Sequence, residues 1–283
     1  MKRLFFPGCT FATAAGYDTS VAAVAEVLEL PLIELPDWNC CGATAYFSLN
    51  ELPALMLPAR NLALAENLGA EELITPCNAC LATSAKARQK LLKHQSLFEK
   101  VNWALAEDRL QLFNPPRLIH LLDLFLEEKT RLLIKVALKR PLKDITVAAY
   151  YGCQYSRPPF WAGRDPENPN GLERFAALTG AKVIDLSSKT ACCGAAQAVI
   201  HSEVARRMVK KIVLEARYKG ADLIVTLCPL CQFNLETLQL QGQLRRQLPV
   251  IFFSQLIGLA LGLEFEALGL KRLLIPFEPA VGF

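Results

Sequence analysis

Residues 223–231 read LIVTLCPLC, a short run of β-prone residues that leads directly into a Cys-x-x-Cys motif. Residues 72–80 repeat this arrangement as ELITPCNAC. The runs at residues 72–75 and 223–226 have the length and composition of buried strands. A long helical stretch that ends in a glycine precedes each one: residues 53–68 with Gly69, and residues 197–219 with Gly220. The pattern therefore predicts that each Cys-x-x-Cys motif lies at the C-terminal end of a strand, with a helix beginning at the motif.

The ten cysteines fall into two copies of one larger pattern, with none left over. Each copy contains a single cysteine, a Cys-Cys-Gly step and a Cys-x-x-Cys motif. The first copy consists of Cys9, Cys40, Cys41, Cys77 and Cys80, and the second of Cys153, Cys192, Cys193, Cys228 and Cys231. The last four cysteines recur at offsets of 152, 152, 151 and 151 residues. A duplication with five thiols in each half indicates two sites for a soft metal.

Short apolar runs also precede the other cysteines. They lie at residues 3–6 and 145–150 before the single cysteines, and at residues 32–35 and 182–186 before the Cys-Cys pairs. With a helix expected over residues 18–30, the order of strands and helices occurs twice. It predicts an α/β fold with two pseudo-symmetric Rossmann-like halves and largely parallel sheets. Because ligands in such folds gather at the C-terminal ends of strands, we expect five thiols on one rim of each half.

Three segments are expected along the chain. Residues 1–96 form the first cysteine repeat, residues 97–143 a helical connector, and residues 144–283 the second repeat with a C-terminal helix. The connector contains the break Asn114-Pro115-Pro116 and a basic amphipathic segment from Lys129 to Lys143. We interpret that segment as a solvated helix face, with a docking surface for an acidic partner as the alternative.

Composition limits the class of protein. Hydrophobic residues make up 52% of the 283 residues and charged residues 20%, which is enough for a substantial core. The net charge of +4 is small, and Lys and Arg are scattered, so the composition argues against a nucleic-acid-binding protein. Pro7 and Gly8 interrupt the N-terminal apolar run too early for a signal peptide.

The longest candidate for a membrane span, residues 250–263, is interrupted by polar residues and glycines and falls short of the roughly 18 residues required. We therefore expect a cytoplasmic chain with reduced thiols, which favours metal or redox chemistry.

Three kinds of chemistry are possible for groups of cysteines: disulfides, zinc sites and iron–sulfur clusters. Disulfides require pairs, and five cysteines per half leave one unpaired. Structural zinc takes four ligands, and the three histidines, His94, His120 and His201, have no ligand spacing. Iron–sulfur clusters are held by thiolates from separated loops and use more ligands than a single ion. Gly42 and Gly194 supply small volume where the backbone approaches a cluster.

The repeated Cys-Cys-Gly pattern resembles the CCG (cysteine-rich) domain family, as found in the B subunit of heterodisulfide reductase. The resemblance covers essentially the whole chain. Beyond the cysteines, it includes Tyr150-Tyr151-Gly152-Cys153, Arg157-Pro158, the loop at residues 165–169 and the final helix at residues 253–263.

This resemblance implies a function. It implies that the five cysteines of each copy bind one noncubane [4Fe-4S] cluster, and that a small disulfide or thiol substrate reacts between the two clusters. The chain would then be the catalytic subunit of an oxidoreductase acting on sulfur groups, with a cubane iron–sulfur subunit and a flavin subunit as partners. The methanogen members usually read Cys-Cys-Pro or a close variant in the first motif. The Cys-Cys-Gly-Ala found here favours a bacterial heterodisulfide reductase-like member, in sulfur oxidation or in a related thiol- or quinone-linked assembly.

Two other functions remain open, namely a pure electron-transfer subunit of a multi-subunit redox complex and a zinc-binding scaffold. The chain has neither a Gly-rich dinucleotide fingerprint nor a ferredoxin-like cysteine run, so electrons must come from a partner.

Two further features lie close to the second motif in sequence. Lys189 is a candidate group near the site, and ordinary burial statistics favour a surface lysine. The loop at residues 156–166 is a candidate substrate lid or partner surface, with an ordinary rigid surface loop as the alternative. In this loop, Arg157 and Arg164 are candidates to meet an anionic substrate.

Overall fold

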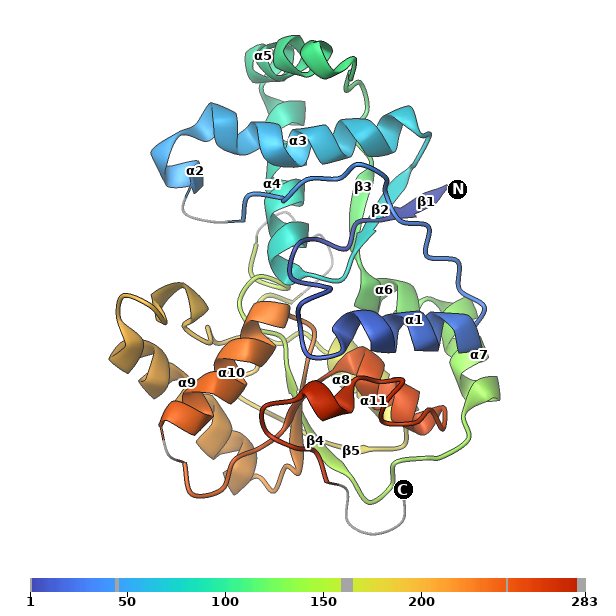
Figure 1. Cartoon of the computed structure of the whole chain (residues 1–283), viewed down its shortest axis with the longest axis vertical. Coiled ribbons are helices and arrows are strands. Elements are labelled where there is room, and N and C mark those ends of the chain that lie inside the picture. The colour runs from blue at the N-terminus through green and yellow to red at the C-terminus, as the bar shows by residue number, and fades with distance from the viewer. Residues whose placement is uncertain (1, 44–45, 159–164, 243, 279–283) are drawn as a thin grey trace. The chain divides into compact units, whose positions relative to one another are not determined.

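The computed structural model describes residues 2–43, 46–158, 165–242 and 244–278 (Figure 1). The described residues form two compact units. The first contains residues 2–9, 31–124 and 158, and the second contains residues 10–30, 125–157 and the remainder of the described chain.

The first unit is built on three parallel strands in the order β1-β2-β3. They are β1 (Arg3–Phe5), β2 (Glu72–Thr75) and β3 (Arg117–His120). Phe5 also forms a parallel bridge with Glu34, so the predicted strand at residues 32–35 contributes a single bridge beside β1. The helices of this unit are α2 (Tyr46–Leu49), α3 (Glu51–Asn67), α4 (Asn78–Lys93), α5 (Gln95–Leu105), the 3-10 turn η1 (Ala106–Asp108) and most of α6 (Leu121–Leu126).

The second unit is built on four parallel strands in the order β5-β4-β6-β7. They are β4 (Thr146–Tyr150), β5 (Lys182–Ile184), β6 (Leu223–Thr226) and β7 (Val250–Phe252). Its helices are α1 (Tyr17–Val27), α7 (Glu128–Ala137), α8 (Gly171–Leu178), α9 (Ser202–Tyr218), α10 (Pro229–Gln241) and α11 (Phe253–Ala260), with 3-10 turns η2 (Ala195–Gln197) and η3 (Leu270–Arg272). The predicted α/β fold with two halves and parallel sheets is confirmed.

The two sheets have the same strand order once the bridge at Glu34 is counted. Strand β3 and helix α6 then correspond to β7 and α11. In both pairs a side chain in the first helical turn accepts a hydrogen bond from the last strand residue, at 3.0 Å from His120 N to Asp123 and 2.8 Å from Phe252 N to Gln255. Because β3 lies within residues 97–143, the connector predicted to be helical is not wholly helical.

Helix α1 belongs to the second unit although the sequence places it between Cys9 and Cys40. It packs against α11, shown in blue and red in Figure 1. The Tyr17 ring stacks on Phe252 with centroids 3.9 Å apart, and the hydroxyls of Ser20 and Ser254 are 2.8 Å apart. The helix expected to complete the first half therefore completes the core of the second.

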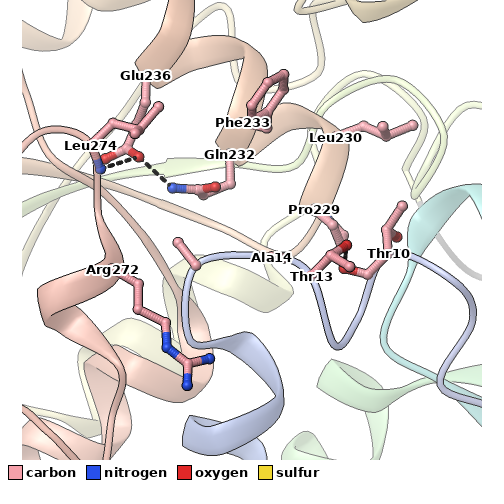
Figure 2. Close-up of a pocket in the computed structure, with 11 residues that line it drawn as sticks. Thr10, Thr13, Ala14, Pro229, Leu230, Gln232, Phe233, Glu236, Arg272 and Leu274 are labelled. Atoms are coloured by element: carbon pink, nitrogen blue, oxygen red, sulfur yellow. Dashed lines mark hydrogen bonds between the residues drawn. The ribbon is translucent and has the colours of Figure 1, made fainter.

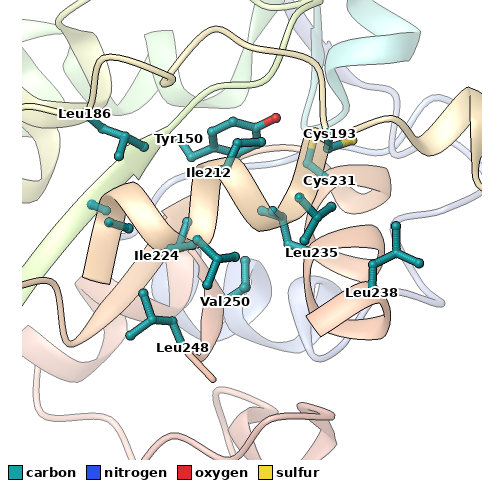
Figure 3. Packing of buried hydrophobic residues seen from close by; sticks show 14 of the residues in the cluster. Tyr150, Leu186, Cys193, Ile212, Ile224, Cys231, Leu235, Leu238, Leu248 and Val250 are labelled. Atoms are coloured by element: carbon teal, nitrogen blue, oxygen red, sulfur yellow. The ribbon is translucent and has the colours of Figure 1, made fainter. Parts of the chain in front are cut away.

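A buried cluster in the second unit brings the cysteine motif into contact with the core (Figure 3). Aliphatic residues from α9, β6, α10 and β7 surround it, among them Ile212, Ile224, Leu235 and Val250, and Cys193, Cys228 and Cys231 are part of the same cluster. The thiols of this motif are thus held in an apolar environment of low dielectric. Among the described residues, no helix has both the length and the apolar character needed to cross a membrane.

Candidate metal centres

The second set of cysteines is assembled from three strand ends. Cys153 follows β4, the Cys192-Cys193 pair follows β5, and Cys228 forms the N-cap of α10 after β6. The five thiols form a continuous chain of contacts, from Cys153 to Cys192, to Cys193, to Cys231 and to Cys228. The strand order therefore brings together all five residues that the sequence pattern grouped.

The first set also gathers its five thiols, in two contacting groups. The Sγ atoms of Cys9 and Cys40 are 3.9 Å apart, and those of Cys41 and Cys80 are 3.2 Å apart. Cys80 also contacts Cys77, the N-cap of α4, and Cys9 interacts electrostatically with both Cys41 and Cys77. Within the described ranges, no three His, Cys, Asp or Glu side chains have the geometry of a site for one metal ion.

A glycine makes room for one sulfur in each set. Gly8 and Gly152 have φ angles of +74° and +69°, a left-handed conformation that favours glycine. A Cβ atom at Gly8 would lie 2.7 Å from the Sγ of Cys80, and one at Gly152 would lie 2.8 Å from the Sγ of Cys231. Only a residue without a side chain fits at either position, so each set is built for close approach of the backbone to its last cysteine.

Each set is open at its corresponding two cysteines. Cys9 and Cys40 are exposed, and their counterparts Cys153 and Cys192 are partly exposed. The other six cysteines are buried. A ligand held by the five thiols would therefore be reached by solvent or substrate past the single cysteine and the first member of the Cys-Cys pair.

Contacts between thiols divide the charge unequally in the second set. Hydrogen bonds from Cys153 and Cys193, together with the backbone N–H of Gly194, lower the pKa of Cys192 to about 2. The hydrogen bond with Cys192 raises the pKa of Cys153, and it raises that of Cys193 to about 12. Without a cation, Cys192 is thus the thiolate, and the thiols of Cys153 and Cys193 stabilise it by hydrogen bonds. A bound metal would hold all of them deprotonated.

Buried asparagine side chains on α3 and α10 anchor the Cys-Cys segments. In the first unit, Asn61 accepts a hydrogen bond from Asn39 N at 2.9 Å and donates one to the Asn39 carbonyl at 2.7 Å. In the second, Asn234 donates to the carbonyl of Cys193 at 2.5 Å. Sequence reasoning missed these residues because a single buried asparagine on a helix carries no pattern of its own.

Lys189 is not the surface residue that burial statistics favoured. Its side chain is only 7% exposed, and its Nζ lies 2.8 Å from Glu173, which also accepts a hydrogen bond from the Tyr151 hydroxyl. The Lys189 carbonyl accepts hydrogen bonds from the N–H groups of Tyr151 and Gly152 at 2.9 and 3.2 Å. The interpretation as a surface lysine was wrong because the carboxylate offsets the cost of burying the charge. Lys189 joins the segment before Cys192 to the segment before Cys153.

Two other buried groups near the thiols were not predicted. The Tyr150 hydroxyl donates to the Ala191 carbonyl at 2.7 Å, and burial beside the thiols raises its pKa. In the first unit, the ring of His120 accepts a hydrogen bond from Leu122 N at Nδ1, so its Nε2 carries the proton that bonds the Pro76 carbonyl at 3.1 Å. His120 thus fixes the residue before Cys77.

The loop proposed as a lid is described only in part. Residues 159–164, including Arg164, lie outside the described residues. Arg157 pairs with Glu167 at 3.5 Å, and its charge helps lower the pKa of Cys192, so it lies near the open side of the second set.

The chain is similar in sequence to several known proteins. Residues 3–83 and 147–236 match the model of the CCG cysteine-rich domain. The chain is 33% identical over 274 residues to the 8-methylmenaquinol:fumarate reductase membrane anchor subunit of Wolinella succinogenes, covering 95% of each chain. It is 29% identical over 280 residues to the B subunit of the ferredoxin/F420H2-dependent CoB-CoM heterodisulfide reductase of Methanosarcina acetivorans, covering 96% of this chain and 93% of that one.

Among solved structures, a hypothetical protein from Helicobacter pylori aligns with 98% of the chain at a TM-score of 0.77 and 17% sequence identity. This chain spans about half, 52%, of the Helicobacter pylori protein. At that identity the likeness concerns the fold alone.

Proposed function

Because the chain belongs to the family of proteins with the CCG cysteine-rich domain, we propose that it is an iron–sulfur redox subunit with one cluster in each unit. The observation that carries this proposal is the pair of five-thiol groups, each gathered within its own unit. A tetrahedral zinc site takes four ligands, so five neighbouring thiols exceed what one zinc ion uses. Thiolates from separated loops are the ligands of iron–sulfur clusters.

The residues present fit such a group. Gly8 and Gly152 leave space beside a sulfur where any side chain would collide with it. Cys77 and Cys228 sit at helix N-termini, where the helix dipole stabilises a thiolate. The apolar core under the second set excludes water from its buried side. A bound cluster would supply one-electron redox chemistry that these side chains lack.

The finer proposal is that the clusters are noncubane [4Fe-4S] clusters and that the substrate is a small disulfide or a pair of thiols. The relatives named as B subunits of CoB-CoM heterodisulfide reductases support this reaction class. The open side of each set, at Cys9 and Cys40 and at Cys153 and Cys192, is where such a substrate would reach the thiol-held group. Arg157 would attract an anionic substrate to the second set. Since the relatives are named as subunits, we propose cubane iron–sulfur and flavin subunits as partners.

Anaerobic metal analysis tests the assignment. The purified chain should contain iron and acid-labile sulfide and no stoichiometric zinc. The variants Cys80→Ser and Cys231→Ser should each lose the iron of one unit and retain that of the other, and the double variant should lose both. A colourless, zinc-loaded protein would rule out the proposal. If iron is bound, reduction of a small aliphatic disulfide by a reduced viologen tests the reaction class.

One observation favours a second function, electron transfer linked to a quinol. The relative at 33% identity is named as a subunit of an 8-methylmenaquinol:fumarate reductase. In that case the chain would carry electrons and have no disulfide substrate. An iron-loaded chain that is reduced by a quinol analogue and does not reduce disulfides would favour this function.

A further inference from the structure

A pocket of about 500 Å³ lies beside the start of α10, and all its lining residues belong to the second unit (Figure 2). Pro229 and Leu230, the two residues between Cys228 and Cys231, form part of its wall. Thr10, which follows Cys9 directly in the chain, lines it as well. A ligand in this pocket would therefore contact the second Cys-x-x-Cys motif itself.

Exposed apolar side chains gather at this pocket. Leu230, Phe233 and Leu274 are 42%, 61% and 51% exposed, and all three line it. Large apolar side chains grouped around a concave surface mark a binding site, whereas scattered ones are ordinary. The pocket volume lies within the range of sites for small organic ligands. The ligand should therefore present a substantial apolar face.

Polar groups stand on two sides of the pocket. Figure 2 shows Arg272 on one side and Thr10 and Thr13 on the other. The amide nitrogen of Gln232 donates to Glu236 at 2.8 Å and to the Val250 carbonyl at 3.3 Å, and its carbonyl oxygen points away from Glu236 in Figure 2. The ligand should therefore carry polar atoms at two separated positions.

The charges argue for an uncharged ligand. Arg272 is balanced by Asp18, with 3.7 Å between the guanidinium and the carboxylate. Glu236 is buried, and its carboxylate is used by Gln232 and by the N–H groups of Leu274 and Ile275 at 3.0 and 3.3 Å. An anionic ligand in the pocket would meet the Glu236 carboxylate, and the Arg272 guanidinium that could attract it is already balanced by Asp18. A neutral ring avoids that repulsion.

We propose that this pocket binds the ring of an isoprenoid naphthoquinone. One ring oxygen accepts a hydrogen bond from Arg272 and the opposed oxygen lies against Thr10 and Thr13, the ring packs against Leu230 and Phe233, and the chain substituent leaves across exposed apolar surface. This inference rests on the quinol-linked function proposed above and supplies the binding site which that function needs. The site is a property of the second unit alone.

Calorimetric titration of the full chain, purified anaerobically, with 2,3-dimethyl-1,4-naphthoquinone tests the proposal. Ala14 lines the pocket and Ala12, two residues earlier, is exposed and does not, so Ala14→Leu should weaken binding by about tenfold or more by filling the space, and Ala12→Leu should not. Phe233→Ala should weaken binding about tenfold through lost ring contact. Tyr218→Ala, which removes an aromatic ring 90% exposed elsewhere in the same unit, is its control. Thermal unfolding of each variant reports whether it folds.

No binding by the wild-type chain, or binding unchanged in both Ala14→Leu and Phe233→Ala, would overturn the assignment. So would displacement of the naphthoquinone by dithiodiglycolate, an anionic aliphatic disulfide, at lower concentration. Iron and sulfide counts on the same samples keep the two claims apart. An iron-loaded chain that ignores the quinone refutes the pocket alone, whereas a chain without iron refutes the cluster proposal whatever it binds.

Discussion

Replacing Gly152 by alanine should remove the metal site of the second unit and leave that of the first. The new Cβ atom would lie 2.8 Å from the Sγ of Cys231, and ordinary van der Waals contact begins at 3.4 Å, so the two atoms must separate by about 0.6 Å (3.4 − 2.8). Metal–ligand distances tolerate about 0.2 Å. The sulfur therefore cannot stay in place for a metal while the backbone keeps its path.

Alanine at this position also carries a backbone cost, because φ is +69°. That strain is about 1 kcal/mol and would by itself destabilise the fold without touching a sulfur. Gly220→Ala is a matched control, since Gly220 has a φ of +81° in the same unit and nothing within 4 Å of the added carbon. Gly8→Ala and Gly69→Ala form the same pair in the first unit, with φ of +74° at both positions and the sulfur of Cys80 near Gly8 only.

The assay is iron and acid-labile sulfide per chain after anaerobic reconstitution, with thermal unfolding of the same samples before metal is added. All four variants should lose similar stability in the metal-free form. Gly152→Ala and Gly8→Ala should each hold roughly half of the wild-type iron, the double variant almost none, and the two controls the full amount. Full loading of Gly152→Ala, or equal losses in Gly152→Ala and Gly220→Ala, would refute the reasoning.

Three further predictions concern stability, and denaturant unfolding measures each of them. Burial raises the pKa of Glu215, but hydrogen bonds from Ser187 and Ser188 outweigh it and lower the pKa to about 2. Because the folded value lies below the unfolded value, the charged Glu215 stabilises the fold above pH 4.5, and this stabilisation is lost as the pH falls toward 2. Glu215→Gln should be less stable by about 2 kcal/mol at pH 7, and the deficit should shrink by pH 3; a constant deficit would contradict this. Lys189→Met should cost about 3 kcal/mol by leaving Glu173 without its cation, and adding Glu173→Gln should recover part of the loss; no recovery would show that the ion pair is not the cause. Ser20→Ala should cost about 1 kcal/mol by orphaning the buried hydroxyl of Ser254, and Ser20→Ala/Ser254→Ala should cost no more than the single change; additive losses would count against this hydrogen bond.

Local sequence patterns predicted the strands that carry the cysteines. Strands β2 and β6 begin and end at the predicted residues, because four β-prone residues bounded by a helix-ending glycine and a cysteine motif leave little alternative. Helices α4 and α10 begin at the Cys-x-x-Cys motifs as expected. Strands β3 and β7 were missed, since the helix that follows each begins at the very next residue and no turn marks the end of the strand.

The sequence pattern did not predict contacts between segments that lie far apart in the chain. Helix α1 has the expected position in the chain, but nothing in its own residues tells that Tyr17 stacks on Phe252. Lys189 reads as a surface residue until Glu173, 16 residues away, is placed beside it. Residues that hold the cysteine segments, such as Asn61 and Asn234, are recognised only through the backbone groups they meet.

The two sites share geometry at positions where their sequences differ. The gap between the single cysteine and the Cys-Cys pair is 30 residues in the first copy and 38 in the second. Even so, the glycine before the single cysteine meets the last cysteine of its own set in both units, at 2.7 and 2.8 Å from an added Cβ. Because the extra residues leave this contact unchanged, the contact is a requirement of the site and not a consequence of loop length. Each unit then contains a complete set of five thiols with its own glycine, so damage to one set should leave the metal content of the other intact.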